Sequence, residues 1–305
     1  MGRTRRQALL MAATALSSSS LRASSSSSSS STTTTTAALP GGGSLRLMPL
    51  RHTSVLVDIA GRRVLFDPSL SPSFSAQGVF AAPPAARAPE ELGPLDLVCV
   101  SSGELTSFDA RTVARLDLGR ARILVPDDDT AARVRRLGHS RVRVVRAGDT
   151  VAVAGLVVHV SPGRGVASDA VGFHVAHAGA STTTTSSAAT AAIWHTGLVP
   201  PLDVDARVAA FAGAHGARVV LGCAWGLRLR AGGPDYAASL DDVITLARLA
   251  RARVLFPLGA SKDAASPAGV FSLVLARSPP LPEPLPDSVD LAVRLPLAGT
   301  WYRLP

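Results

Sequence analysis

The feature that most constrains the fold is an order of elements that occurs twice after residue 44. In each half, short apolar runs separated by turn residues come first, and helical and strand-like segments alternate after them. Such an order builds one mixed sheet in each half, and each sheet must bury a face against another layer. We therefore predict one α/β domain over residues 44–305, a four-layer αβ/βα sandwich of two mixed β-sheets with outer helices.

Hydrophobic spacing, capping residues and turn residues predict the individual elements. Strands are predicted at 45–49, 53–59, 63–66, 97–101, 122–125, 142–145, 150–154, 156–161, 171–176, 191–195, 218–221, 253–257, 289–295 and 300–304. Helices are predicted at 108–118, 128–137, 204–214, 240–250 and 267–277. The three runs between 142 and 161 are expected to form one meander.

The first 43 residues have no pattern that could form a core. They are rich in arginine at the start, continue with serine and threonine runs, and end in Pro40 and three glycines, and residues 1–57 contain no Asp or Glu. This composition predicts a transit segment and a chloroplast location. A mitochondrial location, a twin-arginine export signal at Arg5-Arg6 and a plain disordered tail remain alternatives.

Charge and composition exclude several classes of function. Six arginines of residues 1–57 supply most of the net charge of +9, which leaves the rest of the chain only mildly basic. Lys262 is the only lysine, and aromatic residues make up 4% of the chain, so we expect no nucleic-acid partner. No apolar run reaches the ~20 residues of a membrane-spanning helix, so no transmembrane segment is predicted. Cys99 and Cys223 are too few for a disulfide framework and are predicted as buried apolar residues.

One loop suggests a family. Residues 55–59 and 64–68 form a predicted hairpin that ends in Asp67-Pro68, and the strand at 97–100 runs into the polar loop 101–109. This order resembles the start of the metallo-β-lactamase superfamily, in which such a strand enters a Ser-His-x-His-x-Asp-His motif. The Ser-Ser-Gly of the loop is similar to a plastid and cyanobacterial branch that has Ser-Gln-Gly there.

The resemblance implies a zinc site, but the matching positions hold other residues. The three histidine positions fall on Ser102, Glu104 and Ser107, and the aspartate position falls on Thr106. The later ligand positions fall on residues 160–163, where no histidine stands, and on two leucines, Leu198 and Leu258. A single carboxylate does not hold a dinuclear zinc site. We therefore predict no metal and no other cofactor.

These substitutions predict a pseudoenzyme that binds an unknown small molecule or protein in an organelle. The alternative is a hydrolase with a rebuilt site that uses Asp67, Glu104, Asp109 or His195. No Gly-x-Ser-x-Gly elbow supports a serine hydrolase. The candidate residues of the former pocket are Asp67, Ser102, Glu104, Thr106, Ser107, His195, Leu198 and Leu258.

Histidines elsewhere give no recognisable ligand spacing. His174 and His177 lack both the His-x-His spacing and the helical i, i+4 spacing, and the others are scattered along the chain. We expect none of them to bind a metal. Asp67 is expected to accept backbone N–H groups, and His195 is expected to be a structural histidine.

Overall fold

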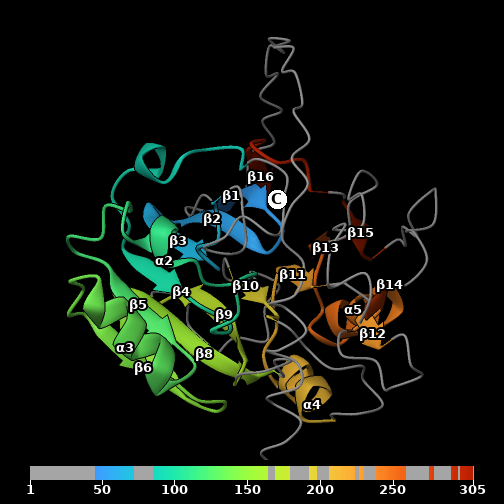
Figure 1. The fold of residues 1–305 in the computed structure, drawn as a ribbon. Coiled ribbons are helices and arrows are strands. Elements are labelled where there is room, and N and C mark those ends of the chain that lie inside the picture. The colour runs from blue at the N-terminus through green and yellow to red at the C-terminus, as the bar shows by residue number, and fades with distance from the viewer. Residues whose placement is uncertain are drawn as a thin grey trace, which may run out of the picture.

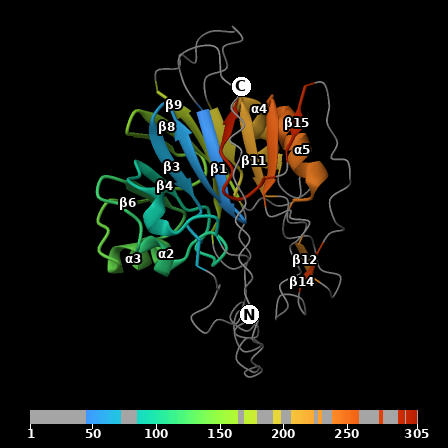
Figure 2. The same ribbon diagram turned by 90° about the horizontal axis from the view of Figure 1, so that it is seen from above.

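A computed structural model describes residues 45–71, 85–163, 169–178, 192–197, 206–223, 227–229, 238–258, 275–277, 290–294 and 296–304. Two large sheets lie face to face in its centre, and helices cover their outer faces (Figure 1). Viewed from above, α2 and α3 lie on one side of the pair of sheets, and α4 and α5 lie on the other (Figure 2). This is the predicted four-layer arrangement.

The first sheet has seven strands. In spatial order they are β16 (Tyr302–Leu304), β1 (Leu45–Arg51), β2 (Ser54–Ile59), β3 (Arg62–Phe66), β4 (Leu97–Cys99), β5 (Arg122–Val125) and β6 (Val142–Val144). The strands from β16 to β3 pair antiparallel, and those from β3 to β6 pair parallel. The sheet is therefore mixed, as the order of the elements predicted.

The second sheet repeats this plan. In spatial order its strands are β15 (Ala292–Val293), β13 (Val254–Leu258), β11 (Val219–Cys223), β10 (Ala192–His195), β9 (Val171–His177), β8 (Leu156–Pro162) and β7 (Thr150–Val153). Strands β7 to β10 pair antiparallel, and β10 to β15 pair parallel. A separate pair consists of β12 (Leu227–Leu229) and β14 (Leu275–Arg277).

The helices begin where polar side chains can cap them. The described helices are η1 (Pro89–Leu92, a 3₁₀ turn), α2 (Ala110–Val113), α3 (Asp128–Arg136), α4 (Ala206–Ala214) and α5 (Leu240–Leu249). Asp127 caps α3 by accepting the Thr130 N–H at 2.6 Å, and Ser239 forms a capping box with Asp242 at α5. Each cap satisfies N–H groups that the first helical turn leaves without a partner.

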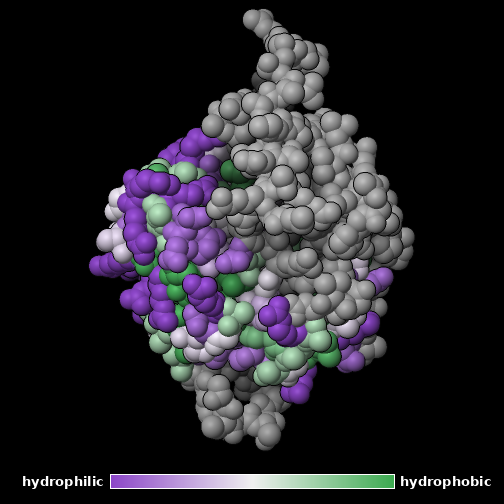
Figure 3. Space-filling view, turned by 60° about the horizontal axis from the view of Figure 1, so that its bottom comes forward, coloured by the Kyte–Doolittle hydropathy of each residue, from purple (hydrophilic) through white to green (hydrophobic). Residues whose placement is uncertain are grey.

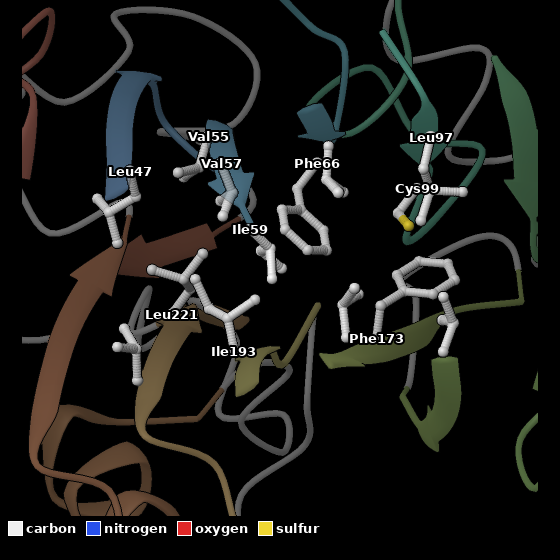
Figure 4. Packing of buried hydrophobic residues seen from close by; sticks show 14 of the residues in the cluster. Leu47, Val55, Val57, Ile59, Phe66, Leu97, Cys99, Phe173, Ile193 and Leu221 are labelled. Carbon is white, nitrogen blue, oxygen red and sulfur yellow. The ribbon is translucent and has the colours of Figure 1, made fainter. Parts of the chain in front are cut away.

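Three apolar layers hold the sandwich together. The central layer lies between the sheets, where side chains of β2 and β3 point toward those of β9, β10 and β11 (Figure 4). The other two layers lie between each sheet and its own helices. The two cysteines are in the central layer, and burial raises the pKa of both thiols well above the ordinary value. Their predicted role as buried apolar residues is confirmed.

Three predicted elements are wrong in detail. The predicted helix at 108–118 is shorter than expected, because α2 covers only Ala110–Val113 and Asp109 precedes it as the capping residue. The run at 142–145 pairs with β5 in the first sheet, so it does not form a meander with β7 and β8. In the predicted helix at 267–277, residues 275–277 form a strand, and the preceding part lies outside the described residues.

One described part of the surface is mainly polar (Figure 3). In Figure 3 hydrophilic side chains gather on the left of the view, and hydrophobic ones are scattered among them. Within the described residues, no helix combines the length and the apolar character needed to cross a membrane.

Candidate functional site

Three strand ends meet at one edge of the sandwich. Asp67 follows β3, Ser101 follows β4, and His195 ends β10 of the opposite sheet. Asp67 has a φ of 48° and donates its N–H to the Cys99 carbonyl at 2.8 Å. Such a left-handed backbone is uncommon outside glycine, and here it directs the carboxylate into the space between the sheets.

The Asp67 carboxylate is the centre of a buried hydrogen-bond network. One oxygen accepts the Ser101 N–H at 2.8 Å, and the other accepts the Ser101 hydroxyl at 2.9 Å. The Ser107 hydroxyl is 3.1 Å from the Ser101 hydroxyl and extends the network along the loop. We call Asp67, Ser101, Ser107 and His195 the strand-end network.

His195 is held in one tautomer. Its Nε2 lies 3.0 Å from the Thr53 carbonyl, and its Nδ1 accepts the Gly197 N–H at 3.2 Å. Because Nδ1 accepts the Gly197 N–H, the bond to the Thr53 carbonyl uses a proton on Nε2. The ring also stacks on Phe66 at a centroid distance of 5.0 Å and is fully buried. Both nitrogens are therefore already occupied.

Burial dominates the titration of Asp67, which is only 1% exposed. Loss of solvation raises its pKa above the ordinary value, although His195 and the hydrogen bonds from Ser101 and Thr53 act in the opposite direction. The His195 Nε2 lies 3.7 Å from the carboxylate. A buried acid with a raised pKa is frequent at catalytic sites, but it also occurs in structural networks.

The loop 101–109 contacts the second sheet on one side and α3 on the other. The Ser101 carbonyl accepts the Val171 N–H at 2.9 Å, and Ser102 forms a bridge with Ala170. On the other side, Arg133 of α3 donates to the Gly103 carbonyl at 2.8 Å. These contacts close the edge at which the resemblance places a metal centre.

The remaining predicted residues have separate positions. Ser102 is buried, and its hydroxyl accepts the Glu104 N–H at 3.3 Å, while Glu104 itself is half-buried. Thr106 contributes its carbonyl, which accepts the Thr53 hydroxyl at 3.1 Å. Leu258 lies in the central apolar layer at the end of β13.

Two more residues complete this account. Asp109 caps α2, and its carboxylate also accepts the Thr112 hydroxyl at 2.7 Å. Leu198 lies outside the described residues. The structure thus brings together Asp67, Ser107 and His195 from the predicted set, and Ser101 joins them.

The zinc that the resemblance implies does not fit this network. Zinc in proteins takes imidazole, thiolate or carboxylate ligands with free lone pairs. The two His195 nitrogens are engaged, which leaves the Asp67 carboxylate as the one ligand of these types in the network. The network also differs from a Ser-His-Asp triad, because Ser101 donates to the carboxylate and His195 has no free nitrogen to accept a proton from it.

A second group of histidines was missed at the sequence level. His159, His174 and His215 each place one ring nitrogen within 4.8 Å of the other two, in a geometry that could hold a metal ion. The expectation that these histidines are scattered is wrong, and the loss of every metal ligand is not supported. Because side chains alternate between the two faces of a strand, the sequence could have indicated that each histidine lies on the outer face of its strand. Only the pairing of β8 with β9 places His159 and His174 opposite each other.

Comparisons with known proteins identify the architecture. Neither protein-family models nor curated proteins gave a match to this sequence. Among solved structures, a possible metal-dependent hydrolase from Veillonella parvula is similar with a TM-score of 0.58 and 14% identity, over 86% of this chain and 99% of that one. An isothiocyanate hydrolase from Delia radicum gut bacteria has a TM-score of 0.55 and 16% identity, over 70% and 84%.

A third similar structure is the metallo-β-lactamase fold protein YhfI from Bacillus subtilis, with a TM-score of 0.48 and 11% identity over 70% of this chain and 86% of that one. At these identities the likeness concerns the fold. The order of the strands and the outer helices agree with it. The chain shares the fold of the two hydrolases, a sandwich of two mixed sheets with outer helices.

Proposed function

We propose that this chain is a pseudoenzyme of the metallo-β-lactamase fold, which binds a small molecule or a protein in an organelle. The observation that carries the proposal is the closed strand-end network. Asp67 and His195 are buried, and their polar atoms have partners within the protein. Among the described residues of this site there is no free donor set that would hold zinc and generate a hydroxide.

The energetics favour a network that stays closed. Freeing either side chain for a metal or a substrate would strand buried partners, such as the Ser101 N–H or the Thr53 carbonyl. Each stranded group costs about 1–3 kcal/mol. The network therefore supports a structural role at the edge where relatives of this fold carry their chemistry.

A rebuilt hydrolase remains the second candidate, and one observation favours it. The His195 Nε2 and the Asp67 carboxylate are 3.7 Å apart, so a small rotation of either side chain would bring them within hydrogen-bond reach. This function would require the edge to open and the His195 tautomer to change. Hydrolysis that depends on Asp67 is its distinguishing property.

Hydrolysis assays on the full chain test both candidates. The substrates are a β-lactam, a phosphodiester, a thioester and an isothiocyanate, each with and without added Zn²⁺, Mn²⁺ or Fe²⁺. We expect no turnover above buffer. Turnover that disappears in Asp67→Asn, while an Asp117→Asn control at an exposed site retains it, would overturn the pseudoenzyme and establish the second candidate.

We further propose that residues 1–43 direct the domain 44–305 to the chloroplast. The support is the acid-free, arginine- and serine-rich composition of that segment. A fluorescent protein fused to residues 1–43 should enter chloroplasts in plant cells, and replacement of Arg3, Arg5 and Arg6 by glutamate should prevent it. Mitochondrial import would favour the other organelle, and an unimported fusion would contradict a targeting role.

A further inference from the structure

The outer face of the second sheet carries a group of histidines that the strand-end network does not involve. His159 of β8 and His174 of β9 are direct cross-strand partners. Their neighbours Val158, Val160 and Phe173 point into the central layer, so the histidines point the other way. His215 follows α4, which packs over β8.

The three rings are close to one another. Centroid distances are 4.6 Å for His159 and His215, 5.6 Å for His174 and His215, and 5.7 Å for His159 and His174. One ring nitrogen from each lies within 4.8 Å of the other two. Two imidazoles on one zinc place their nitrogens about 3.4 Å apart, since each bond is about 2.0–2.1 Å long. Small rotations of the half-buried His159 and His215 would achieve that spacing.

The hydrogen bonds of His174 and His159 each involve one ring nitrogen and leave the other without a bond. The His174 Nε2 donates to the Gly216 carbonyl at 3.0 Å, so its Nδ1 carries a lone pair. That Nδ1 is buried without a hydrogen-bond partner, in a side chain that is 5% exposed. His159 bonds through Nδ1 to the Thr150 hydroxyl at 3.0 Å, which leaves its Nε2 for a ligand. Metal-bound histidines typically bond in this way through the second nitrogen.

Burial also affects the titration of the three rings. Burial lowers the pKa of His174 to about 4, and it lowers the pKa of His159 and His215 as well. The rings next to one another add to the effect, because a second positive charge nearby is unfavourable. Each of these shifts disfavours the charged form of the ring.

We propose that His159, His174 and His215 bind one divalent transition-metal ion of the zinc class on the outer face of the second sheet. Three imidazoles without a carboxylate suit zinc, copper or nickel and are poor ligands for calcium or magnesium. The partial exposure of His159 and His215 gives the ion a route in and leaves a fourth position for water. The ion would tie the end of α4 to β8 and β9.

This site is independent of the proposed pseudoenzyme function, because it lies on the opposite face of the sheet from the strand-end network. His195 and Trp194 are adjacent on β10, yet His195 stacks on Phe66 in the interior while Trp194 packs with the outer layer. Metal bound by the histidines would therefore leave the strand-end network unchanged. Variants of the two regions separate the two proposals.

Zinc titration of the untagged full chain, followed by calorimetry and elemental analysis, is the direct test. We expect one Zn²⁺ per chain, and we expect His159→Ala and His215→Ala each to weaken binding by more than about a hundredfold. His139→Ala, which removes a histidine of the first half of the chain, is the matched control and should bind like the original protein. The proposed site would be overturned if the original protein bound no zinc. It would also be overturned if His159→Ala and His215→Ala both bound zinc as tightly as the original protein.

Two further measurements address the geometry. Co²⁺ in place of Zn²⁺ should give the intense visible absorption of a four-coordinate ion, and His215→Ala should abolish it. Thr150→Val removes the hydroxyl that orients His159 and should weaken zinc binding by about tenfold without unfolding the protein. Zinc that is lost in Asp67→Asn but kept in the histidine variants would contradict both this site and the pseudoenzyme.

Discussion

The strand-end network and the histidine group place the same residue type in opposite situations. His195 lies between the sheets with both nitrogens bonded, whereas His174 lies on the outer face with one buried nitrogen unbonded. The first arrangement stabilises the fold, and the second leaves a lone pair available to a metal. A histidine can bind a metal only if its hydrogen-bond partners leave one nitrogen free. His195 therefore does not bind one, although it lies at the edge where the resemblance places the metal.

Removing His195 should have the largest effect on this comparison. His195→Ala leaves a cavity and strands the Thr53 carbonyl and the Gly197 N–H, so the free energy of unfolding should fall by about 4 kcal/mol. Urea unfolding followed by circular dichroism measures it. His195→Gln, which can still donate to Thr53, should lose less. A loss below about 1 kcal/mol would show that the network is not tightly packed.

Gly197→Ala should come next. Gly197 has a φ of 63°, and an added Cβ would lie 2.3 Å from the Val171 carbonyl oxygen. The strain and the clash together should cost about 3 kcal/mol in unfolding free energy. The control is Gly213→Ala inside α4, where an added Cβ meets nothing within 4 Å and should stabilise by about 0.5–1 kcal/mol. If the two substitutions changed the free energy of unfolding equally, the edge at Gly197 would not be closely packed.

The pH dependence of stability sharpens the account of Asp67. The folded state holds its proton more tightly than the unfolded chain, whose carboxyl titrates near 3.8. Unfolding therefore releases a proton between 3.8 and the raised pKa, and the contribution of Asp67 to stability falls as pH rises through that window. Asp67→Asn lacks this titration, so its stability relative to the original protein should rise with pH. The free energy of unfolding of both proteins is measured by urea unfolding from pH 4 to 8. A constant difference between them over this range would contradict the raised pKa of Asp67.

The smallest effect is expected at His215 in metal-free protein. His215→Ala removes a half-buried ring that contacts Phe211, and it should change the free energy of unfolding by less than about 1 kcal/mol. The zinc-induced rise in melting temperature should nevertheless disappear, because stabilisation by a ligand depends on its binding to the native state. Thermal unfolding with and without Zn²⁺ measures both. If His215→Ala greatly lowered the melting temperature in the presence of a chelator, the ring would have a structural role without any metal.

The architecture was accessible from the sequence because it follows from local patterns. The apolar run at 54–59 indicates a strand, and the capped segment at 128–136 indicates a helix. Because strands followed by alternating helices and strands occur twice along the chain, they predict two mixed sheets. The run at 142–145 was placed in the wrong sheet, since its residues are compatible with pairing on either side. Pairing partners are set by tertiary packing, which a strand pattern does not encode.

The candidate sites were less accessible. Asp67 was identified from the strand that ends in Asp-Pro, but its partner Ser101 was not singled out, and the bonds of His195 to Thr53 and Gly197 join segments far apart in the chain. The histidine group gave no signal in spacing, because His159, His174 and His215 come from two strands and the end of a helix. Ligand spacing is readable only when the ligands share one element or one loop.

The amino-acid sequence by itself determined that this chain builds two mixed sheets with helices outside, and that the zinc-motif positions of the loop 101–109 hold neither histidine nor aspartate. Both follow from the periodicity and identity of neighbouring residues. Only the tertiary structure decided that the loop is sealed around Asp67 and that three distant histidines meet on the opposite face. The physical reason is that hydrogen-bond partners and ligand distances depend on how strands are paired and layers are packed, and neither is a property of any single segment.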